Sequence, residues 1–575
     1  MGNYWARHLP PNITSEFCKR VDTAVQTMVM VSTQLDSSDL DDFTNERMRL
    51  PIKYKGMGLR SLFDRRHSEF IGGMIQGIPP LINRQSDSGL ISHGRVHIQS
   101  MITYLGKHSF DGNPEIKPWE TLLSHGPSPT AQGLKLAWTT LQNEVIDACT
   151  TLQDIQAPIN LLNNVVQSAG FDSLSHKITF KSITKQITIE MESIRSEILD
   201  KEARSADATL NKTNRECTSY LQVDELSSQF LTALPDVLSI MSDKVILEAF
   251  HQYLGRPSPI MRPYVHRDHY IGRKGYEQIV DEFGDSVAAS NLRGGDHIRA
   301  HNEIQTMINA IFRQAGFATS IQPPNIFHGK VPGPALKKYL KLQRRKDFII
   351  PDILVHDHPK DGNAAGARHM EAIFDIKTLH IDKNRYYYSE NVRNFRRAVD
   401  TKVGSVRRDY ARRAEVLDEK CAEDYTSHPF SEALKNNYDS GGVHPIVFGA
   451  FGETDNHTLK MVKTCAKFAA ARSENSDVTP LSDTIQKGSA YQVMLTQFRR
   501  ALGVLAVRTA AETKIRRTTL IGQSREEAWA AAHPEGRRFW EDSGNPFWYK
   551  NRDNEENFHE FYAYHTQYNN FYTDV

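Results

Sequence analysis

Two short apolar runs in the second half of the chain each enclose one acidic residue. The first is residues 347–355, Asp-Phe-Ile-Ile-Pro-Asp-Ile-Leu-Val, and the second is residues 371–377, Glu-Ala-Ile-Phe-Asp-Ile-Lys. Runs of this length that are rich in Ile, Val and Phe predict buried strands. Asp352 and Asp375 would therefore lie inside strands, where a carboxylate is costly unless another charge compensates it.

The segments around these two strands complete an α/β unit. Apolar residues at three-to-four spacing predict helices, shorter apolar runs predict strands, and a stretch rich in Pro and Lys predicts a loop. The expected elements are a helix at 302–315, a strand at 318–322, a loop at 323–346, a basic helix at 391–423, a strand at 445–449 and helices at 458–472 and 490–512. The order helix, three strands, helix and strand predicts an α/β sandwich with a mixed sheet.

The first half of the chain has a different pattern. From about residue 131 to 250 the apolar residues follow helical spacing, as at Ile187, Met191, Ile194 and Ile198. We therefore expect an α+β protein overall, with an α-helical N-terminal half and the α/β sandwich after it. The glycines at 56 and 58 predict a tight turn, with Ser61 as the N-cap of a following helix.

The acid pair suggests metal chemistry. Two carboxylates on neighbouring strands can hold Mg²⁺ or Mn²⁺ through oxygen. Lys377 shares a face with Asp375 because side chains alternate along a strand, so its amine could polarise a water molecule or a phosphate. The alternative is that these are surface strands whose acids pair with nearby arginines.

The segment Asp296-His-Ile-Arg-Ala-His-Asn-Glu303 precedes the sheet and offers further candidates. Glu303 could add a third carboxylate to the metal site. His301 could touch a scissile phosphate, and it would share a face with His297 and Arg299 if the segment were extended. The alternative is a plain helix N-terminus, where Asp296 is favourable beside the positive helix end.

Basic residues gather near the acid pair in the sequence. Several recur at helical spacing, which predicts a stripe that neutralises phosphates, although a run of charges is commonly just a solvated face. The candidates for nucleic-acid binding are His301, Arg344, Arg345, Lys346, Arg396, Arg397, Lys402, Arg407, Arg408, Lys420 and Tyr425.

Composition narrows the setting of this chemistry. The chain has 575 residues and a formal net charge of +1, so any basic surface must be local. Its five cysteines form no Cys-x-x-Cys pair, which argues against a disulfide framework and fits a reducing, intracellular compartment. No apolar run is long enough for a membrane span, and no signal peptide is evident.

Taken together, these motifs resemble a known arrangement. Leu-Pro-Ile-Lys-Tyr-Lys-Gly-Met-Gly-Leu-Arg-Ser, residues 50–61, resembles a stretch just downstream of the polymerase palm in reverse-transcriptase proteins of the non-LTR-retrotransposon type. In that family a helical region, a small zinc-binding element and a restriction-like endonuclease domain of the PD-(D/E)xK superfamily follow. Ile350-Pro-Asp352 and Asp375-Ile-Lys377 match the catalytic strands of that domain, and Arg299-Ala-His-Asn302 resembles its first helix.

The resemblance implies a division of the chain and a set of roles. The expected parts are a reverse-transcriptase-downstream-like segment at 1–85, a helical domain or connector at 86–250, a degenerate zinc-element-like linker at 251–295, a nuclease-like domain at 296–515 and an aromatic-rich tail at 516–575. Asp352, Asp375, Lys377 and Glu303 would be catalytic, with Asp352 and Asp375 as the metal ligands. Lys420 or Tyr425 would be accessory residues on the helix after the active-site strands.

The departures from the family pattern also carry expectations. The family's cysteine and histidine ligands are missing between 278 and 291, so no zinc is expected. No Tyr-x-Asp-Asp polymerase motif is present, so a polymerase partner would act in trans. A nuclear location follows if the source is eukaryotic.

The sequence therefore predicts a magnesium- or manganese-dependent endonuclease that acts on DNA or on an RNA–DNA hybrid. Two alternatives stay open. One is a catalytically inactive nucleic-acid-binding module of the same fold, and the other is a structural or assembly protein whose acids only form ion pairs.

Overall fold

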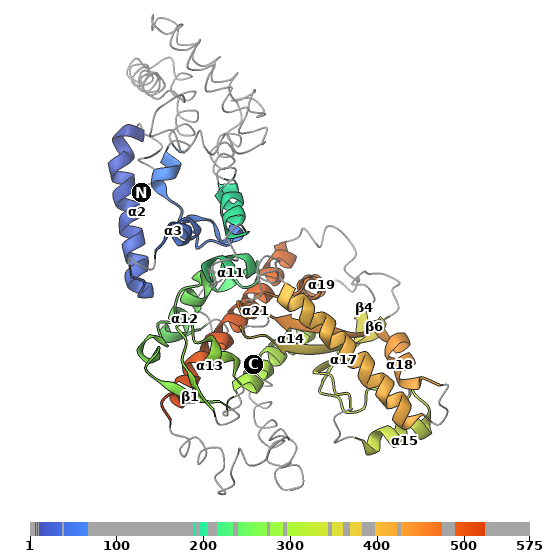
Figure 1. The fold of residues 1–575 in the computed structure, drawn as a ribbon. Helices are drawn as coiled ribbons and strands as arrows, with labels where there is room; N and C mark the ends of the chain where they lie inside the picture. The colour runs from blue at the N-terminus through green and yellow to red at the C-terminus, as the bar shows by residue number, and fades with distance from the viewer. Residues whose placement is uncertain are drawn as a thin grey trace, which may run out of the picture.

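A four-stranded mixed sheet flanked by helices forms the centre of the protein (Figure 1). The computed structural model describes residues 11–36, 40–66, 195–204, 215–233, 240–272, 276–290, 296–342, 348–359, 369–381, 397–422, 427–473 and 489–523, with a few single positions besides. The strands are β3 (Thr319–Ile321), β4 (Ile353–Pro359), β5 (His369–Thr378) and β6 (Tyr438–Phe448). They lie side by side in the order β3-β4-β5-β6.

The strand directions follow from the connections. β3 pairs antiparallel with β4, and β4 pairs antiparallel with β5. β5 and β6 are parallel, with Asp375 opposite Pro445, because the long helix α17 (Arg397–Cys421) crosses between them. Pro445 is tolerated because β6 is an edge strand, and an edge does not need every N–H for pairing. The predicted mixed sheet is confirmed.

Two layers of helices cover the two faces of the sheet, because strand residues alternate between them. One face packs Phe374 and Ile376 against α14 (Asp296–Gln314), α19 (Asn456–Ser473) and α21 (Ser489–Arg517). The other face packs Leu354 and Ile373 against α15 (Gly333–Lys341), α17 and α18 (Pro429–Asn437). Figure 1 shows α17 running diagonally across this second face.

Helix α17 has the amphipathic pattern that such packing needs. Its buried positions include Val399, Val403, Val406, Tyr410 and Leu417, which recur every three or four residues. The intervening positions carry most of its charged residues and face solvent. The Tyr410 hydroxyl is a polar group on this buried stripe, and it donates a hydrogen bond to Asp375 of β5.

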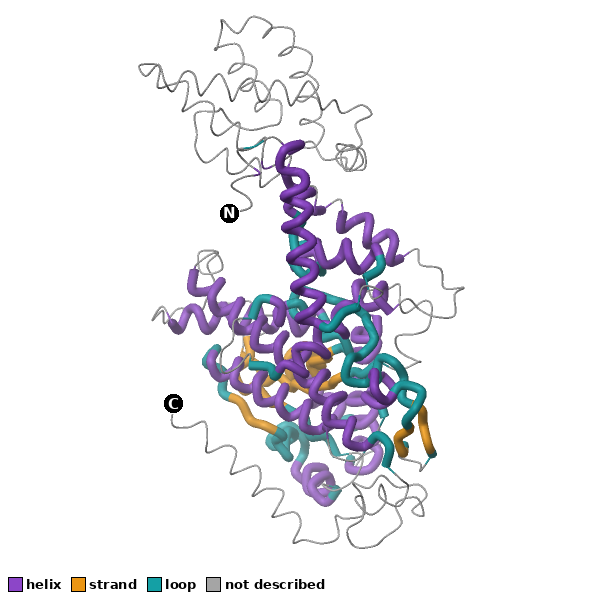
Figure 2. The backbone as a smooth tube through the Cα atoms, turned by 90° about the vertical axis from the view of Figure 1, so that its left-hand side faces the viewer, coloured by secondary structure: helices purple, strands orange, loops and turns teal. Residues whose placement is uncertain are grey.

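Helices from the first half of the chain pack against the same body. They are α2 (Pro11–Thr33), α3 (Asp42–Arg49), α11 (Arg215–Gln222) and α12 (Asp243–Leu254). Val504 of α21 joins the core that α12 and the segment after α11 form around Val223 and Tyr253. Helix α21 thus belongs both to the sheet body and to the helical half. In the perpendicular view of Figure 2, helices lie over the strands in the middle of the described body.

The predicted linker at 251–295 has a small structure of its own. Strands β1 (His269–Ile271) and β2 (Glu277–Ile279) form a hairpin, and the short helix α13 (Asp285–Ala289) follows it. Met261, Tyr270, Val280 and Val287 form its buried core. Hydrophobic packing therefore organises this segment.

Several boundaries differ from the sequence prediction. The helix expected at 302–315 begins earlier, at Asp296, and the strand expected at 445–449 begins at Tyr438. The expected loop at 323–346 contains α15, whose Pro334 lies in the first turn, a common position for proline at a helix start. Most of the aromatic-rich tail and of residues 67–188 lies outside the described residues.

Two further observations concern composition. The four described cysteines, Cys18, Cys217, Cys421 and Cys465, are buried free thiols. Among the described residues, no helix combines the length and the apolar character needed to cross a membrane.

Candidate active site

The structure brings the two predicted acids together at the junction of β4 and β5. Asp352 directly precedes β4, and its main-chain N–H donates to Phe374 O at 3.0 Å. Its side-chain Oδ2 accepts a hydrogen bond of 2.6 Å from Ile376 N, one residue beyond Asp375. Asp352 is 8% exposed and Asp375 is 6% exposed. Two nearly buried carboxylates thus lie close together. Asp375 lies within β5 as the sequence predicted, whereas Asp352 lies one residue before β4, because the strand expected at 347–355 begins at Ile353.

Each acid has a basic partner. Lys377 Nζ lies 2.7 Å from Asp375 Oδ2, and this lysine side chain is about one-third exposed. His301 Nε2 of α14 lies 3.0 Å from Asp352 Oδ2. The Lys377 position agrees with the prediction from the strand period, because residues 375 and 377 share a face.

The electrostatics of Asp375 reflect this crowding. Burial raises the pKa of its carboxyl, the nearby Lys377 ammonium lowers it, and the Asp352 carboxylate raises it again, with a net upward shift. Tyr410 of α17 donates a hydrogen bond of 3.1 Å to Asp375 Oδ1. Burial and then the two carboxylates raise the pKa of the Tyr410 hydroxyl well above its ordinary value, so it stays a donor at neutral pH.

For His301, unlike Asp375, the surroundings favour the charged form of the side chain. Burial of the imidazole lowers its pKa, but the hydrogen bond and charge of Asp352 outweigh burial and raise the pKa above 6.5. Gln305, one turn further along α14, donates to Asp352 O at 2.7 Å. Helix α14 therefore holds Asp352 through both its side chain and its main chain.

Glu303 has a different environment from the one the sequence suggested. Its carboxylate is 2.9 Å from Arg299 Nε and 3.3 Å from an Arg508 nitrogen, in an ion-pair group with Glu512. The reason is helical geometry: segment 296–303 belongs to α14, and residues two apart on a helix point to opposite sides. His301 therefore faces the sheet while Glu303 faces α21. For the same reason His297, Arg299 and His301 do not share one face.

Some of the predicted basic residues lie on α17, and the others lie outside the described residues. Arg407 and Arg408 are exposed on α17, and Lys402 and Lys420 lie on the same helix. Burial raises the pKa of the Cys421 thiol, and the charges of Lys338 and Lys420 act to lower it. Both lysines therefore lie near this thiol, one on α15 and the other at the end of α17. The backbone of Arg397 lies in α17. Arg344, Arg345, Lys346, Arg396 and Tyr425 lie outside the described residues.

Tyr410 is the site residue that sequence reasoning missed. It lies on the apolar stripe of α17, where the pattern predicts a side chain that packs in the hydrophobic core. The sequence did contain a signal for this residue, namely a hydroxyl on an otherwise apolar helix stripe. A buried Tyr O–H group needs a hydrogen-bond partner. His301, predicted to contact nucleic acid, contacts Asp352.

The donor set suits a hard divalent cation. Both acids offer oxygen ligands, and the like charges of Asp352 and Asp375 disfavour each other, a cost that a cation would relieve. Within the described ranges, no group of three or more His, Cys, Asp or Glu side chains is arranged to hold a metal ion. Two carboxylates with water as the remaining ligand fit Mg²⁺, which keeps several waters when bound.

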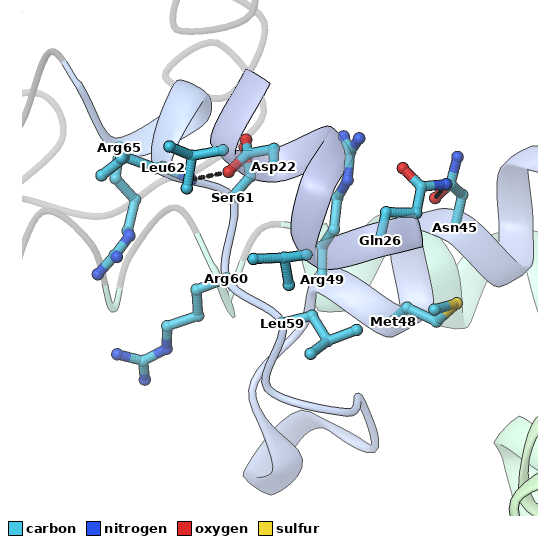
Figure 3. A pocket seen from close by; sticks show the side chains of 12 residues that line it. Asp22, Gln26, Asn45, Met48, Arg49, Leu59, Arg60, Ser61, Leu62 and Arg65 are labelled. Atoms are coloured by element: carbon cyan, nitrogen blue, oxygen red, sulfur yellow. Dashed lines mark hydrogen bonds between the residues drawn. The ribbon is translucent and has the colours of Figure 1, made fainter. Parts of the chain in front are cut away.

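The segment at 50–61 has an architectural role in the structure. A Cβ at Gly56 would lie 2.0 Å from Leu50 O, so this position requires glycine. Ser61 Oγ accepts from Asp64 N at 3.0 Å, which confirms the predicted N-cap, and Asp22 of α2 accepts from Ser61 and Leu62 (Figure 3). The segment therefore ties α2 to α3.

A cavity of about 230 Å³ lies beside this segment (Figure 3). Three arginines line it, but Arg49 pairs with Glu46, Arg60 with Glu192 and Arg65 with Glu69. Its positive charge is thus largely compensated by neighbouring acids.

Comparison with known proteins adds no assignment: no protein-family model matches the sequence, and no curated protein matches it.

Proposed function

We propose that this protein is a metal-dependent endonuclease that hydrolyses phosphodiester bonds in DNA. The observation that carries the proposal is the arrangement of Asp352, Asp375 and Lys377 at the junction of β4 and β5. A hard cation beside two carboxylates, together with one amine, is the equipment that phosphodiester hydrolysis needs.

The proposal includes a finer fold assignment, the PD-(D/E)xK restriction-endonuclease-like fold. Three features support it: a helix before the sheet, three antiparallel strands that carry the acids, and a helix crossing to a parallel fourth strand. The motifs at 350–352 and 375–377 support an origin among proteins of the non-LTR-retrotransposon type. The chain would then act with a polymerase in trans or as part of a larger retroelement machinery.

Each residue has a role in the proposed reaction. Asp352 and Asp375 would hold Mg²⁺ or Mn²⁺, which supplies positive charge that stabilises the transition state and acidifies water. A water oxygen forms a bond to phosphorus while one phosphorus–oxygen ester bond breaks, and the leaving oxygen takes up a proton. Lys377 donates a hydrogen bond to the attacking water or to a phosphate oxygen. His301 and Tyr410 orient the carboxylates.

Nucleic acid would lie along the basic surface that α17 and α15 provide. The exposed side chains of Lys337, Lys338, Lys341, Arg407 and Arg408 offer sequence-independent contacts to phosphates. Phosphate contacts position a duplex without reading its bases, so we expect weak sequence selectivity.

A nicking assay tests the proposal. Supercoiled plasmid is incubated with Mg²⁺ or Mn²⁺ and either wild type, Asp375→Asn or the control Glu419→Gln, whose side chain is exposed on α17. Wild type and Glu419→Gln should nick, chelator should stop nicking, and Asp375→Asn should lower the rate by about 10³-fold, the scale of losing one transition-state-stabilising group. Equal nicking by Asp375→Asn would contradict the assignment.

A catalytically inactive nucleic-acid-binding module is the second candidate, and one observation favours it. Both carboxylates already have basic partners, Lys377 and His301. This candidate predicts retention on DNA with a steep dependence on salt and no cutting under any metal condition. Neither cutting nor retention, with a stable oligomer, would favour an assembly role.

A further inference from the structure

A second polar cavity opens on the α19 side of the sheet. It has a volume of about 180 Å³ and is lined by residues of β4, β5, β6 and α19. It differs from the acid-pair site because Phe374 lines it, while the next residue, Asp375, points to the opposite face of β5.

A buried carboxylate, that of Asp439, is part of the lining of this cavity. Asp439 is 2% exposed, and its Oδ2 lies 3.1 Å from His358 Nδ1 and 3.3 Å from His444 Nε2. Burial raises the pKa of Asp439, but the two imidazoles outweigh burial and hold it far below its ordinary value. The carboxylate is therefore charged at neutral pH.

The other oxygen of this carboxylate has no hydrogen-bond partner among the described residues. Asp439 Oδ1 is buried and accepts no hydrogen bond from any described residue. A charged oxygen left in this state is costly, and native structures rarely keep one without a reason. A ligand that donates an N–H or O–H hydrogen bond to Asp439 Oδ1 would remove this cost.

The walls favour a flat ligand. Phe374, Ile446 and Met461 supply apolar surface. The Phe374 ring and the His444 imidazole are stacked, with centroids 5.2 Å apart and planes inclined by 25°. A lining of apolar side chains and aromatic rings suits a ligand that itself has a planar ring.

The mouth of the cavity is positively charged. Lys460 and His457, in the first turns of α19, line it and are exposed. Burial and then the Arg407 guanidinium lower the pKa of His457, so the charge of Arg407 on α17 lies near the same opening. An anionic group is therefore favoured at this opening.

We propose that this cavity binds one nucleotide, with an N–H edge of the base toward Asp439 and the phosphate toward Lys460 and Arg407. The nucleotide comes either free from solution or from a single strand that follows the basic side of α17. The second source rests on the proposed function, because it needs nucleic acid on that helix.

Titration calorimetry in the presence of chelator tests the cavity without involving catalysis. The probes are dCMP and dAMP, with 2-deoxyribose 5-phosphate as the base-free control. Both nucleotides should bind, and the base-free phosphate should bind at least about tenfold more weakly, because it cannot donate to the charged oxygen. Equal binding of the base-free phosphate, or no binding of either nucleotide, would overturn the proposal.

Two variants locate the binding. Asp439→Asn should weaken dCMP roughly tenfold and leave the base-free phosphate unchanged. Lys460→Met should weaken all three phosphates, and this exposed position does not endanger folding. Lys463→Met, exposed on the same helix but outside the cavity, is the matched control. Wild-type affinity in Lys460→Met would count against the site even if Asp439→Asn failed to fold.

A competition experiment separates the two sources. A fluorescent single-stranded oligonucleotide that dCMP displaces indicates a strand-borne nucleotide, and binding of dCMP without displacement indicates a free one. Asp375→Asn should bind dCMP like wild type. A protein that binds dCMP but never nicks would thus disprove the nuclease and leave this site intact.

Discussion

Two groups of buried charge show how differently this molecule treats ionisable side chains. Between the helices, Lys514 lies 3.0 Å from Glu248 and 3.8 Å from Asp285, and Arg215 lies 3.2 Å from Asp285. All four residues are buried. This group joins α11, α12, α13 and α21 and balances two acids with two bases.

The acid pair at the sheet is arranged otherwise. Asp352 and Asp375 place like charges close together, so that each disfavours ionisation of the other. Their basic partners, Lys377 and His301, are more exposed than the acids themselves. The comparison teaches that the helical group is built for a stable interface, whereas the acid pair accepts an electrostatic cost that binding of a cation would relieve.

The largest expected effect is on stability in the helical group. Lys514→Met leaves Glu248 buried without its cation, so the free energy of unfolding should fall by about 3–5 kcal/mol. Urea denaturation measures the change, with exposed Lys463→Met as the control expected to stay within about 0.5 kcal/mol of wild type. Asp375→Asn should not destabilise comparably. A loss as large as that of Lys514→Met would erase the distinction between the two groups.

The next effect concerns Tyr410. Tyr410→Phe removes the hydrogen bond to Asp375 and keeps the ring in the α17 stripe, so nicking should slow roughly 3- to 10-fold, the worth of one hydrogen bond. Single-turnover plasmid nicking provides the measurement. Tyr339→Phe is the control, because this buried tyrosine belongs to the same core as Tyr410 while its hydroxyl donates to Ile349 O. It should leave the rate unchanged. No difference between the two variants would remove Tyr410 from the site.

The pH dependence of stability should differ between wild type and Asp375→Asn. The folded-state pKa of Asp375 is raised above its ordinary 3.8, so the folded protein binds more protons than the unfolded chain just above that value. Its contribution therefore favours folding at low pH and is lost as the pH rises through the raised pKa. In metal-free urea titrations, the stability of wild type relative to Asp375→Asn should fall over this window. A difference independent of pH would show that the carboxyl titrates normally.

The smallest expected effect is that of Glu303. Glu303→Gln loses ion pairs to Arg299 and Arg508 at a partly exposed position, so the nicking rate should stay within about twofold of wild type. The same plasmid assay tests whether Glu303 serves only in these ion pairs or also in the metal site. A loss as large as that of Asp375→Asn would restore Glu303 as the third carboxylate that the sequence suggested.

Strand and helix positions in the sheet body could be predicted because their patterns are local. The apolar runs around Asp352 and Asp375 located β4 and β5, and the two-residue period placed Lys377 beside Asp375. Helix α15 was missed because it is short and lies in a segment dense in basic residues that was predicted as a loop. The backbone of segment 296–303 was treated as extended for one argument, and the helix that forms there separates His301 from Glu303.

The sequence by itself determined the two apolar runs that contain Asp352 and Asp375, since apolar composition and periodicity depend only on neighbours along the chain. Only the tertiary structure decided which side chains surround those acids. His301 reaches Asp352 across 51 residues and Tyr410 reaches Asp375 across 35. The Asp439 cavity needs His358, 81 residues away in the sequence, to lie beside it. Such contacts arise from packing two helix layers onto a sheet, and no local pattern encodes the register of that packing.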